Sequence, residues 1–257
     1  MNQPLSYGDA IRIDGLRVSF SSKLILKDVN LAFPARTISV VIGRSGSGKT
    51  TLLRALNRLN ECFPGCETSG TVKMQLRDTV VDVYRDGLPL AELRRRVGMV
   101  FQVPNVLPVS IGRNLALPLR LVLGIDKREI PDRIEEALKS VHLWSEVRDR
   151  LKDRATTLSG GQQQRLCLAR VLALQPDVLL LDEPTASLDF RSAMKIEELL
   201  LHLKEKYTVI AVSHSLSQTR RLADVVVVLS GGRIVRRLSS SEFSEHQAVE
   251  ALLEAAF

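Results

Sequence analysis

The segment GRSGSGKT, residues 43–50, constrains the fold of this chain more than any other feature. It follows TISVVI, a short β-branched apolar run typical of a buried parallel strand, and precedes TLLRALNRLN, whose leucines recur at helical spacing. A glycine-rich turn between a strand and a helix lets backbone N–H groups surround phosphate oxygens, and the helix adds the positive end of its dipole. The sequence therefore predicts a phosphate-binding loop on an α/β core.

Two side chains of this loop have specific expected tasks. Lys49 can reach the β- and γ-phosphates of a nucleotide, and the hydroxyl of Thr50 is placed to ligate Mg²⁺. The nucleotide-binding residues predicted here are Gly43, Arg44, Ser45, Gly46, Ser47, Gly48, Lys49, Thr50 and Thr51.

Two carboxylates end a second apolar strand, in the segment PDVLLLDEPT. Asp182 stands where a P-loop fold needs an acid to hold Mg²⁺, usually through water. Glu183 is one residue further on, where it can polarise a water that attacks the γ-phosphate. Taken alone, this pattern favours a polar strand end that leads into a loop. Together with the loop upstream, it indicates a P-loop NTPase.

The segment LSGGQQQR, residues 158–165, narrows the class. It matches the signature sequence of ABC ATPases, and the chain resembles that family from about residue 10 to residue 238. Ser159 and the backbone at a helix N-terminus make a second phosphate-binding surface, with Ser159, Gly160, Gly161 and Gln162 as its predicted residues. In ABC ATPases the other protomer supplies this surface, so the resemblance implies a head-to-tail homodimer or a pair of ATPases.

Other family elements follow in the expected order. The resemblance implies that Gln102, in VGMVFQVP, senses Mg²⁺ and the attacking water and joins the core to a helical lobe. It implies that Asp189 lies in a loop crossing the dimer interface, and that His214 contacts the γ-phosphate. Phe20 occupies the place of the aromatic residue that stacks on adenine, although a core role fits it equally. The remaining histidines match no motif and are expected at the surface: His142, His202 and His246.

The resemblance also implies the architecture, a RecA-like α/β core with an antiparallel β subdomain and a helical subdomain at about residues 103–170. Residues 1–257 would then form a single ABC ATPase domain. The residue pattern agrees: residues 70–84 indicate short strands, and helices are expected at about 127–143 and 160–174. The segment MKIEELLLHLKEKY predicts an amphipathic helix with Ile196, Leu199, Leu200 and Leu203 on one face.

Composition leaves several partners open. The net charge of +7 suits nucleic acid, anionic lipid headgroups or a nucleotide, and it also suits a basic surface with no single partner. Three scattered cysteines indicate reduced thiols and no disulfide framework. We find no signal-peptide pattern and no apolar run near the roughly 20 residues that span a bilayer. Any membrane part is therefore expected from another chain.

The family implies ATP and Mg²⁺ as cofactors and paired permease subunits as partners, with a solute-binding protein engaged indirectly. It implies a peripheral location at the cytoplasmic face of the inner membrane, and no nucleic acid is expected. Three stretches resemble the ATPase of the bacterial phosphate importer: TLLRALNRLNE, RVGMVFQVPNVLPVSI and KIEELLLHLKEKYTVIAVSH. The step Phe20-Ser21-Ser22 and the tail after Arg236 depart from that group. Phosphate import is thus one interpretation beside another importer or exporter, or a soluble ABC ATPase in DNA repair or translation.

Overall fold

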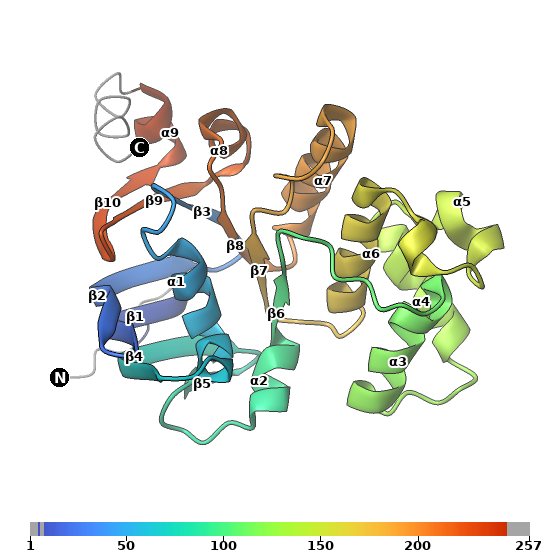
Figure 1. The fold of residues 1–257 in the computed structure, drawn as a ribbon, viewed down its shortest axis with the longest axis horizontal. Coiled ribbons are helices and arrows are strands. Elements are labelled where there is room, and N and C mark those ends of the chain that lie inside the picture. The colour runs from blue at the N-terminus through green and yellow to red at the C-terminus, as the bar shows by residue number, and fades with distance from the viewer. Residues whose placement is uncertain (1–4, 6–7, 246–257) are drawn as a thin grey trace.

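The computed structural model describes Leu5 and residues 8–245, which form two sheets and a set of helices (Figure 1). The first sheet is antiparallel and four-stranded, with the order β2-β1-β4-β5. Its strands are β1 (Asp9–Phe20), β2 (Lys23–Pro34), β4 (Cys66–Leu76) and β5 (Thr79–Asp82). Phe20 pairs with Lys23 on one side and with Cys66 on the other, so it lies at a corner of this sheet.

The second sheet is six-stranded, with the order β10-β9-β3-β8-β7-β6. β3, β6, β7, β8 and β9 pair in parallel, and β10 pairs antiparallel with β9 as the hairpin at Gly231-Gly232 predicts. The strands are β3 (Ile38–Ile42), β6 (Val97–Val100), β7 (Val178–Asp182), β8 (Thr208–Val212), β9 (Val225–Ser230) and β10 (Arg233–Ser239). Every residue of β3 is buried, because layers cover both faces of a parallel sheet.

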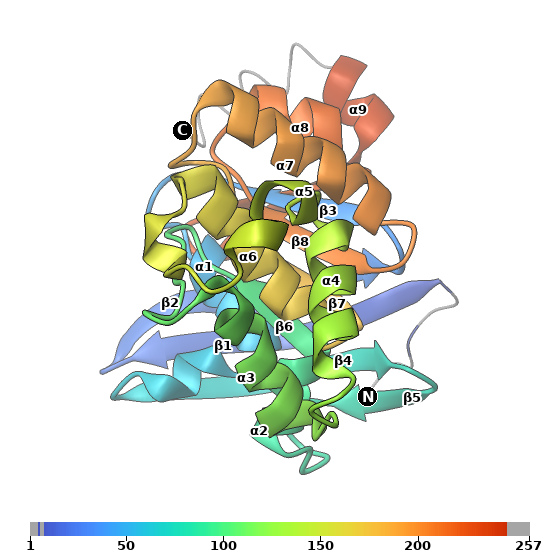
Figure 2. The same ribbon diagram turned by 90° about the vertical axis from the view of Figure 1, so that its right-hand side faces the viewer.

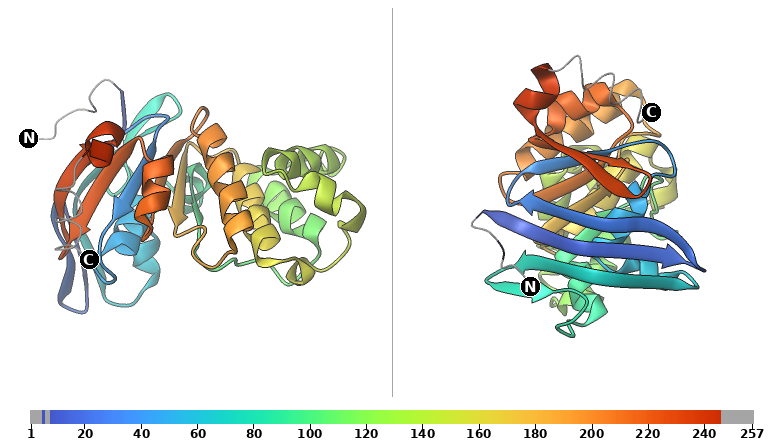
Figure 3. Two further views of the ribbon diagram at one scale, coloured as in Figure 1. Left: turned by 90° about the horizontal axis from the view of Figure 1, so that it is seen from above. Right: turned by 90° about the vertical axis from the view of Figure 1, so that its left-hand side faces the viewer.

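The helices divide into two groups. Those of the core are α1 (Lys49–Leu56), α2 (Leu90–Arg96), α7 (Phe190–Leu203), α8 (Leu216–Leu222) and α9 (Ser240–Glu245). Those of the helical region are α3 (Ile111–Leu123), α4 (Ile130–Ser140), α5 (Trp144–Val147) and α6 (Gly160–Leu172). Three 3₁₀ turns are η1 (Leu59–Cys62), η2 (Arg148–Arg150) and η3 (Ala155–Thr157). The helical region forms one end of an elongated molecule, with the antiparallel sheet at the other (Figure 3).

Two hydrophobic cores lie on opposite faces of the six-stranded sheet. Along β3, Ile38 and Val40 belong to the core shared with α7 and the helical region, and Val41 belongs to the core shared with α1 and the antiparallel sheet. Figure 2 shows this layering, with α7, α8 and α9 on one side of the sheet and the antiparallel strands on the other. The predicted α/β fold with its antiparallel sheet is therefore confirmed.

The sequence placed three element boundaries wrongly. α1 ends at Leu56, short of the ten-residue run TLLRALNRLN, because Arg58 takes a left-handed φ of 57° that an α-helix does not contain. α4 begins at Ile130 and not near residue 127, since Pro131 suits only the first turn of a helix. β4 begins at Cys66, well before residue 70, because its first residues pair with the end of β1. The amphipathic face predicted for α7 is confirmed, since all four of its apolar residues are buried.

Among the residues that the structure describes, no helix is both long and apolar enough to cross a membrane. The most apolar candidate, α3, turns Ile111, Leu115 and Leu119 into the core of the helical region. Those three residues therefore pack within the chain, whereas Leu121 and Val122 near the end of the same helix are exposed.

The three cysteines are all free thiols. Cys62 is exposed, Cys66 is partly buried and Cys167 is buried. Burial raises the pKa of the Cys167 thiol.

Candidate active site

The loop between β3 and α1 is built on glycines whose backbone other residues rarely adopt. Gly43, Gly46 and Gly48 have φ of 152°, 77° and 105°. A Cβ on Gly43 would lie 2.0 Å from the carbonyl oxygen of Leu229, and one on Gly48 would lie 2.9 Å from the side chain of Leu26. Close approach of β9 and β2 therefore fixes the loop in a shape that only glycine permits.

Lys49 is folded into this loop. Its Nζ donates hydrogen bonds to the carbonyl oxygens of Gly43, at 2.7 Å, and Arg44, at 2.9 Å. Burial lowers the pKa of Lys49, while Glu183 and Asp182 act in the opposite direction. A buried ammonium held by carbonyl oxygens can exchange them for the stronger acceptors of a phosphate.

Thr50 and Asp182 meet beside the loop. The Thr50 hydroxyl donates to Oδ1 of Asp182 at 2.9 Å, which joins the start of α1 to the end of β7. Burial raises the pKa of Asp182, and the hydrogen bond from Thr50 opposes that shift. The Oγ of Ser47 is buried and finds no partner within the described chain. A buried carboxylate beside a hydroxyl suits a hard cation such as Mg²⁺.

Mg²⁺ would still need ligands from outside the protein. In the part of the chain that the structure describes, no group of three or more histidine, cysteine or acidic side chains lies together. Mg²⁺ usually takes one or two carboxylates and completes its shell with water and substrate phosphates. The site therefore fits a metal that arrives with a nucleotide.

Glu183 and His214 meet where two neighbouring parallel strands end. Glu183 follows β7 and His214 follows β8, and Nε2 of the imidazole lies 2.5 Å from Oε1 of the carboxylate. Glu183 has a φ of 47°, rare for a residue with a side chain, and its backbone N–H donates to the carbonyl oxygen of Val212. The strand-end carboxylate that sequence alone left open as a polar loop entrance is thus part of a specific pair.

These side chains share one open hollow of about 480 Å³, a size that suits a small-molecule site. It brings together Phe20, the glycine loop, Gln102, Glu183 and His214 from five separate stretches of sequence. The predicted residues that line it are Phe20, Ser45, Gly46, Gly48, Lys49, Thr50, Thr51, Gln102, Glu183 and His214.

The signature segment does not line this hollow. Ser159 caps the N-terminus of α6: its Oγ accepts from the backbone N–H of Gln162, and the Gln162 side chain accepts from the N–H of Ser159. Gly160 and Gly161 form the first turn. The segment therefore presents a capped helix N-terminus, a surface that suits an anion, away from Lys49.

Asp189 lies beside the signature and likewise does not line the hollow. It caps α7 by accepting from the backbone N–H of Ser192 at 3.0 Å, and the hydrogen bonds from Ser192 lower the pKa of Asp189. A Cβ on Gly161 would lie 2.6 Å from Oγ of Ser192, so the starts of α6 and α7 are in close contact. The predicted site residues thus form two groups within one chain.

Residues 26–186 match the family described as ABC transporter. The chain belongs to this family. It is an ATPase: it binds and hydrolyses ATP. It is similar to CbiO1 of Clostridium perfringens, described as part of the ABC transporter complex CbiONQ, at 27% identity and a TM-score of 0.78 over 95% of this chain and 94% of that one.

A second solved structure is a dimer of the ATP-binding cassette MJ0796 in a post-hydrolysis state, bound to ADP and Pi. The sequence of our protein is 29% identical to that of MJ0796, and the two structures superpose with a TM-score of 0.74 over 90% of our chain and 98% of the MJ0796 chain.

In this ABC ATPase the loop that carries Gln102 is tied to the signature helix. Gln102 follows β6, and the carbonyl oxygen of the preceding Phe101 accepts from Nε2 of the buried Gln164, on α6, at 3.1 Å. Further along the loop, the Asn105 side chain accepts from Arg170 of the same helix at 2.8 Å. The signature helix is therefore hydrogen-bonded to the backbone beside Gln102.

Sequence reasoning missed the surroundings of Phe20. The ring of Phe63 meets that of Phe20 edge-on, with 6.3 Å between centroids, and the Arg54 guanidinium lies 5.1 Å from the centroid of Phe63. Lys23 and Ile25 also line the hollow. The one available signal was position, since Lys23 and Ile25 closely follow Phe20 in the chain.

The histidines without a motif lie away from this hollow. His142 and His202 are exposed, as the sequence predicts, and His246 lies outside the described residues. Of the histidines within the described residues, only His214 lines the hollow.

Proposed function

We propose that this ATPase works as one half of a homodimer in an ABC importer complex, with each ATP held between two chains. The observation that carries this proposal is the separation of the two phosphate-binding groups within one chain. Lys49, Glu183 and His214 share a hollow that Ser159 does not line. A second chain placed head to tail brings its signature to that hollow. The dimeric state of MJ0796 with ADP and Pi supports this arrangement.

Lys49 holds the β- and γ-phosphates, and the N–H groups of the glycine loop surround them. Phe20 stacks on the adenine ring. Across the interface, Ser159 and the first turn of α6 hold the γ-phosphate, and Asp189 approaches the same boundary. These contacts fix the phosphate between two surfaces, so that ATP binding favours the closed dimer.

Thr50, Asp182 and Gln102 are the residues that would hold Mg²⁺. The bound ion would neutralise charge on the β- and γ-phosphates. Glu183 accepts a proton from the attacking water, and His214 keeps its carboxylate oriented and contacts the γ-phosphate. Hydrolysis removes the group that both chains grip, and the dimer reopens.

The membrane partner in this proposal is a pair of permease subunits. Large apolar side chains are exposed around the loop after Gln102 and on α3, with Val103 69% and Leu121 76% exposed. In this proposal the permease subunits pack against these exposed apolar side chains. CbiO1 is part of a transporter complex, which supports the same placement. The proposed location is the cytoplasmic face of the inner membrane.

Inorganic phosphate is the proposed solute, delivered by a solute-binding protein that engages the permease. The proposal rests on the three stretches quoted above, of which NRLNE is the most specific. The ATPase does not contact the solute, so the solute depends on the permease. Another importer or exporter is one alternative, and a soluble ABC ATPase is the other.

Mixed dimers test the shared ATP site. Ser159→Arg places a large side chain where the partner's γ-phosphate would lie, and Lys49→Ala removes the phosphate contact on the other surface. In a dimer of one Ser159→Arg chain and one Lys49→Ala chain, the first ATP site joins the altered Lys49 surface to the altered signature. The second ATP site joins the two unaltered surfaces and therefore carries neither defect. The turnover of the mixture should therefore exceed the sum of the two variants measured alone. Rates that simply add would refute the shared site.

Capture from native membranes tests the transport role. We expect the chain to copurify with a permease pair, identified by mass spectrometry, and phosphate uptake to fall when the gene is deleted. A permease recovered with phosphate uptake intact would remove phosphate as the solute. Recovery without any membrane protein would favour the soluble class.

A further inference from the structure

A polar cluster around the buried Arg165 of α6 lies behind the signature, and its acidic member is Glu146 on the short helix α5. Glu146 accepts from Nε2 of Gln162 at 2.9 Å, through Oε2, and from the Arg165 guanidinium at 2.9 and 3.0 Å, through both oxygens. Arg165 is 5% exposed and also donates to the carbonyl oxygen of His142 at 2.7 Å. One carboxylate thus holds two side chains of the first turns of α6.

The contact with Gln162 reaches Ser159 directly. The Gln162 amide donates to Glu146 through Nε2 and accepts from the Ser159 backbone N–H through Oε1 at 3.0 Å. An amide has a donor end and an acceptor end, so the carboxylate at one end fixes which end faces Ser159. The Oγ of Ser159 accepts from the Gln162 N–H, which leaves its own hydrogen available to an outside acceptor.

We propose that Glu146 is a positioning residue for the phosphate-binding surface that the signature presents to the partner chain. This inference rests on the shared ATP site proposed above. Glu146 touches no nucleotide in that arrangement, and it acts by holding the Gln162 amide and, through it, the cap at Ser159. Hydrogen bonds to a charged acceptor are stronger than neutral ones, so a carboxylate holds this geometry better than an amide would.

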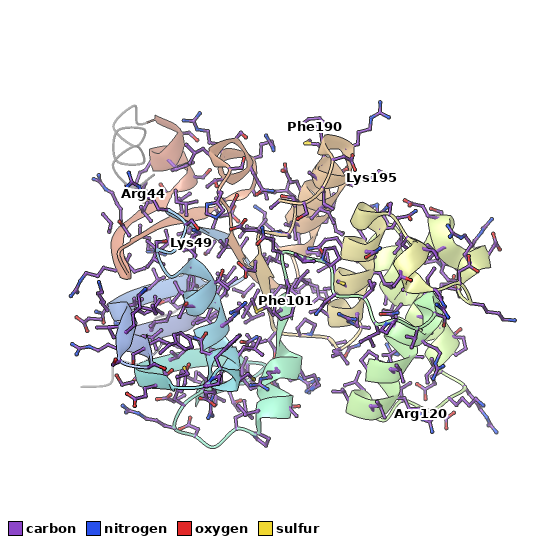
Figure 4. The ribbon with its side chains drawn as sticks, viewed as in Figure 1. Arg44, Lys49, Phe101, Arg120, Phe190 and Lys195 are labelled. Atoms are coloured by element: carbon purple, nitrogen blue, oxygen red, sulfur yellow. The ribbon has the colours of Figure 1, made fainter. Side chains whose placement is uncertain are left out.

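The same carboxylate also faces α7, the helix that Asp189 begins. Lys195 of α7 places its Nζ 3.9 Å from Oε1 of Glu146, and Figure 4 shows Lys195 on α7 beside α6. Gly161 contacts Ser192 of that helix. The signature is thus held from α5 on one side and from α7 on the other, and Glu146 belongs to both contacts.

The charged state of Glu146 is secured by its partners. Burial raises the pKa of this carboxyl, but the hydrogen bonds from Arg165 and Gln162 outweigh burial and leave the pKa below its ordinary value. Glu146 is therefore ionised at neutral pH. Replacing Glu146 by a neutral residue would leave the buried Arg165 without its carboxylate partner, and that loss by itself lowers the stability of the fold.

The test separates nucleotide binding by one chain from dimer formation. In a Glu183→Gln background, which retains ATP, one measures the Kd of ATP on the dilute single chain and the Kd of the ATP-bound dimer by sedimentation. Glu146→Ala should leave the Kd of ATP on the single chain unchanged. It should raise the Kd of the ATP-bound dimer by at least about tenfold, the effect of losing one hydrogen bond to a charged group. Glu146→Gln keeps the size of the side chain and should act in the same direction if Glu146→Ala folds poorly.

Two controls make the outcomes distinct. Glu135→Ala removes an exposed carboxylate of α4 that pairs with Lys139, and it should change neither constant. Ser159→Arg should abolish the ATP-bound dimer. If Ser159→Arg weakens the dimer and both Glu146 variants match wild type, the positioning role is wrong and the shared site stands. If Ser159→Arg has no effect, the shared site itself is wrong, and the role of Glu146 fails with it.

Discussion

Nε2 of His214 lies 2.5 Å from Oε1 of Glu183, so the two side chains that follow β7 and β8 form a direct pair. Asp182 and Val212 are register partners in these parallel strands, which brings the residues after them to the same edge of the sheet. The pair lines the hollow that also contains Lys49. One carboxylate oxygen is engaged by the imidazole, and the other can accept from a water.

Glu183→Gln should keep ATP binding and lose most hydrolysis. The amide has nearly the shape of the carboxylate but cannot take a proton, so turnover should fall by roughly 10²- to 10⁴-fold, the range for a general base. ATP binding by equilibrium titration and phosphate release by a coupled assay measure the two effects. Glu198→Gln, an exposed residue of α7, is the matched control and should match wild type. Hydrolysis by Glu183→Gln near the wild-type rate would show that Glu183 is not the catalytic base.

Phe20 should contribute to nucleotide affinity through its ring. Phe20→Ala removes the stacking surface at the corner of the antiparallel sheet, and the Kd for ATP should rise roughly tenfold, within the range for stacking on an aromatic ring. Phe20→Tyr keeps the ring and should retain affinity. If the alanine variant binds ATP normally and only loses stability, Phe20 is a core residue, as the sequence also allowed.

Local patterns reveal the parts of this site that depend on neighbours in sequence. The strand before Gly43, the loop and the start of α1 follow from residue type alone, and so does the buried face of α7. The contact between Phe20 and Phe63 could not be foreseen. It depends on Phe20 pairing with Cys66 between β1 and β4, a register set by the whole antiparallel sheet.

The same limit applies to the signature. Its match predicts a capped helix with glycines at the start, and α6 has both. The hold of Glu146 on Gln162 depends on how α5 packs against α6, which no spacing rule encodes. The early end of α1 was missed for a related reason: the left-handed φ of Arg58 is a property of the loop that follows, while the leucine spacing continues through it.

Gly232 should be required for both stability and nucleotide binding. It has a φ of 81°, and a Cβ there would lie 2.0 Å from the carbonyl oxygen of Ile25. Its N–H donates to the carbonyl oxygen of Ser47 at 3.1 Å, so the β9–β10 hairpin supports the phosphate-binding loop. Gly232→Ala should therefore lower the free energy of unfolding and also weaken ATP binding.

Gly231→Ala is the matched control for that variant. Gly231 has a φ of 53°, and a Cβ there would meet nothing within 4 Å, so its cost is backbone strain alone, about 1–2 kcal/mol. Urea unfolding should show a larger loss for Gly232→Ala than for Gly231→Ala. If the two variants lose the same free energy of unfolding, the hairpin accommodates the added Cβ of Gly232→Ala without displacing Ile25 or Ser47.

Glu92 should stabilise the fold only above acidic pH. Hydrogen bonding from Arg95, helped by Arg96 and opposed by burial, lowers the pKa of Glu92 from 4.5 to about 2. A carboxyl with a depressed pKa in the folded state contributes stability that is fully present above its unfolded pKa, and this stability is lost as pH falls from 4.5 toward 2.

Glu92→Gln lacks this contribution at every pH. The difference in unfolding free energy between wild type and Glu92→Gln should therefore be constant between pH 6 and 7, on the order of 1 kcal/mol for a partly exposed pair, and should shrink below about pH 4.5. Glu135→Gln, which alters an exposed pair on α4, should show a smaller difference throughout. A difference for Glu92→Gln that does not change with pH would mean that the ionised carboxylate is not what stabilises α2.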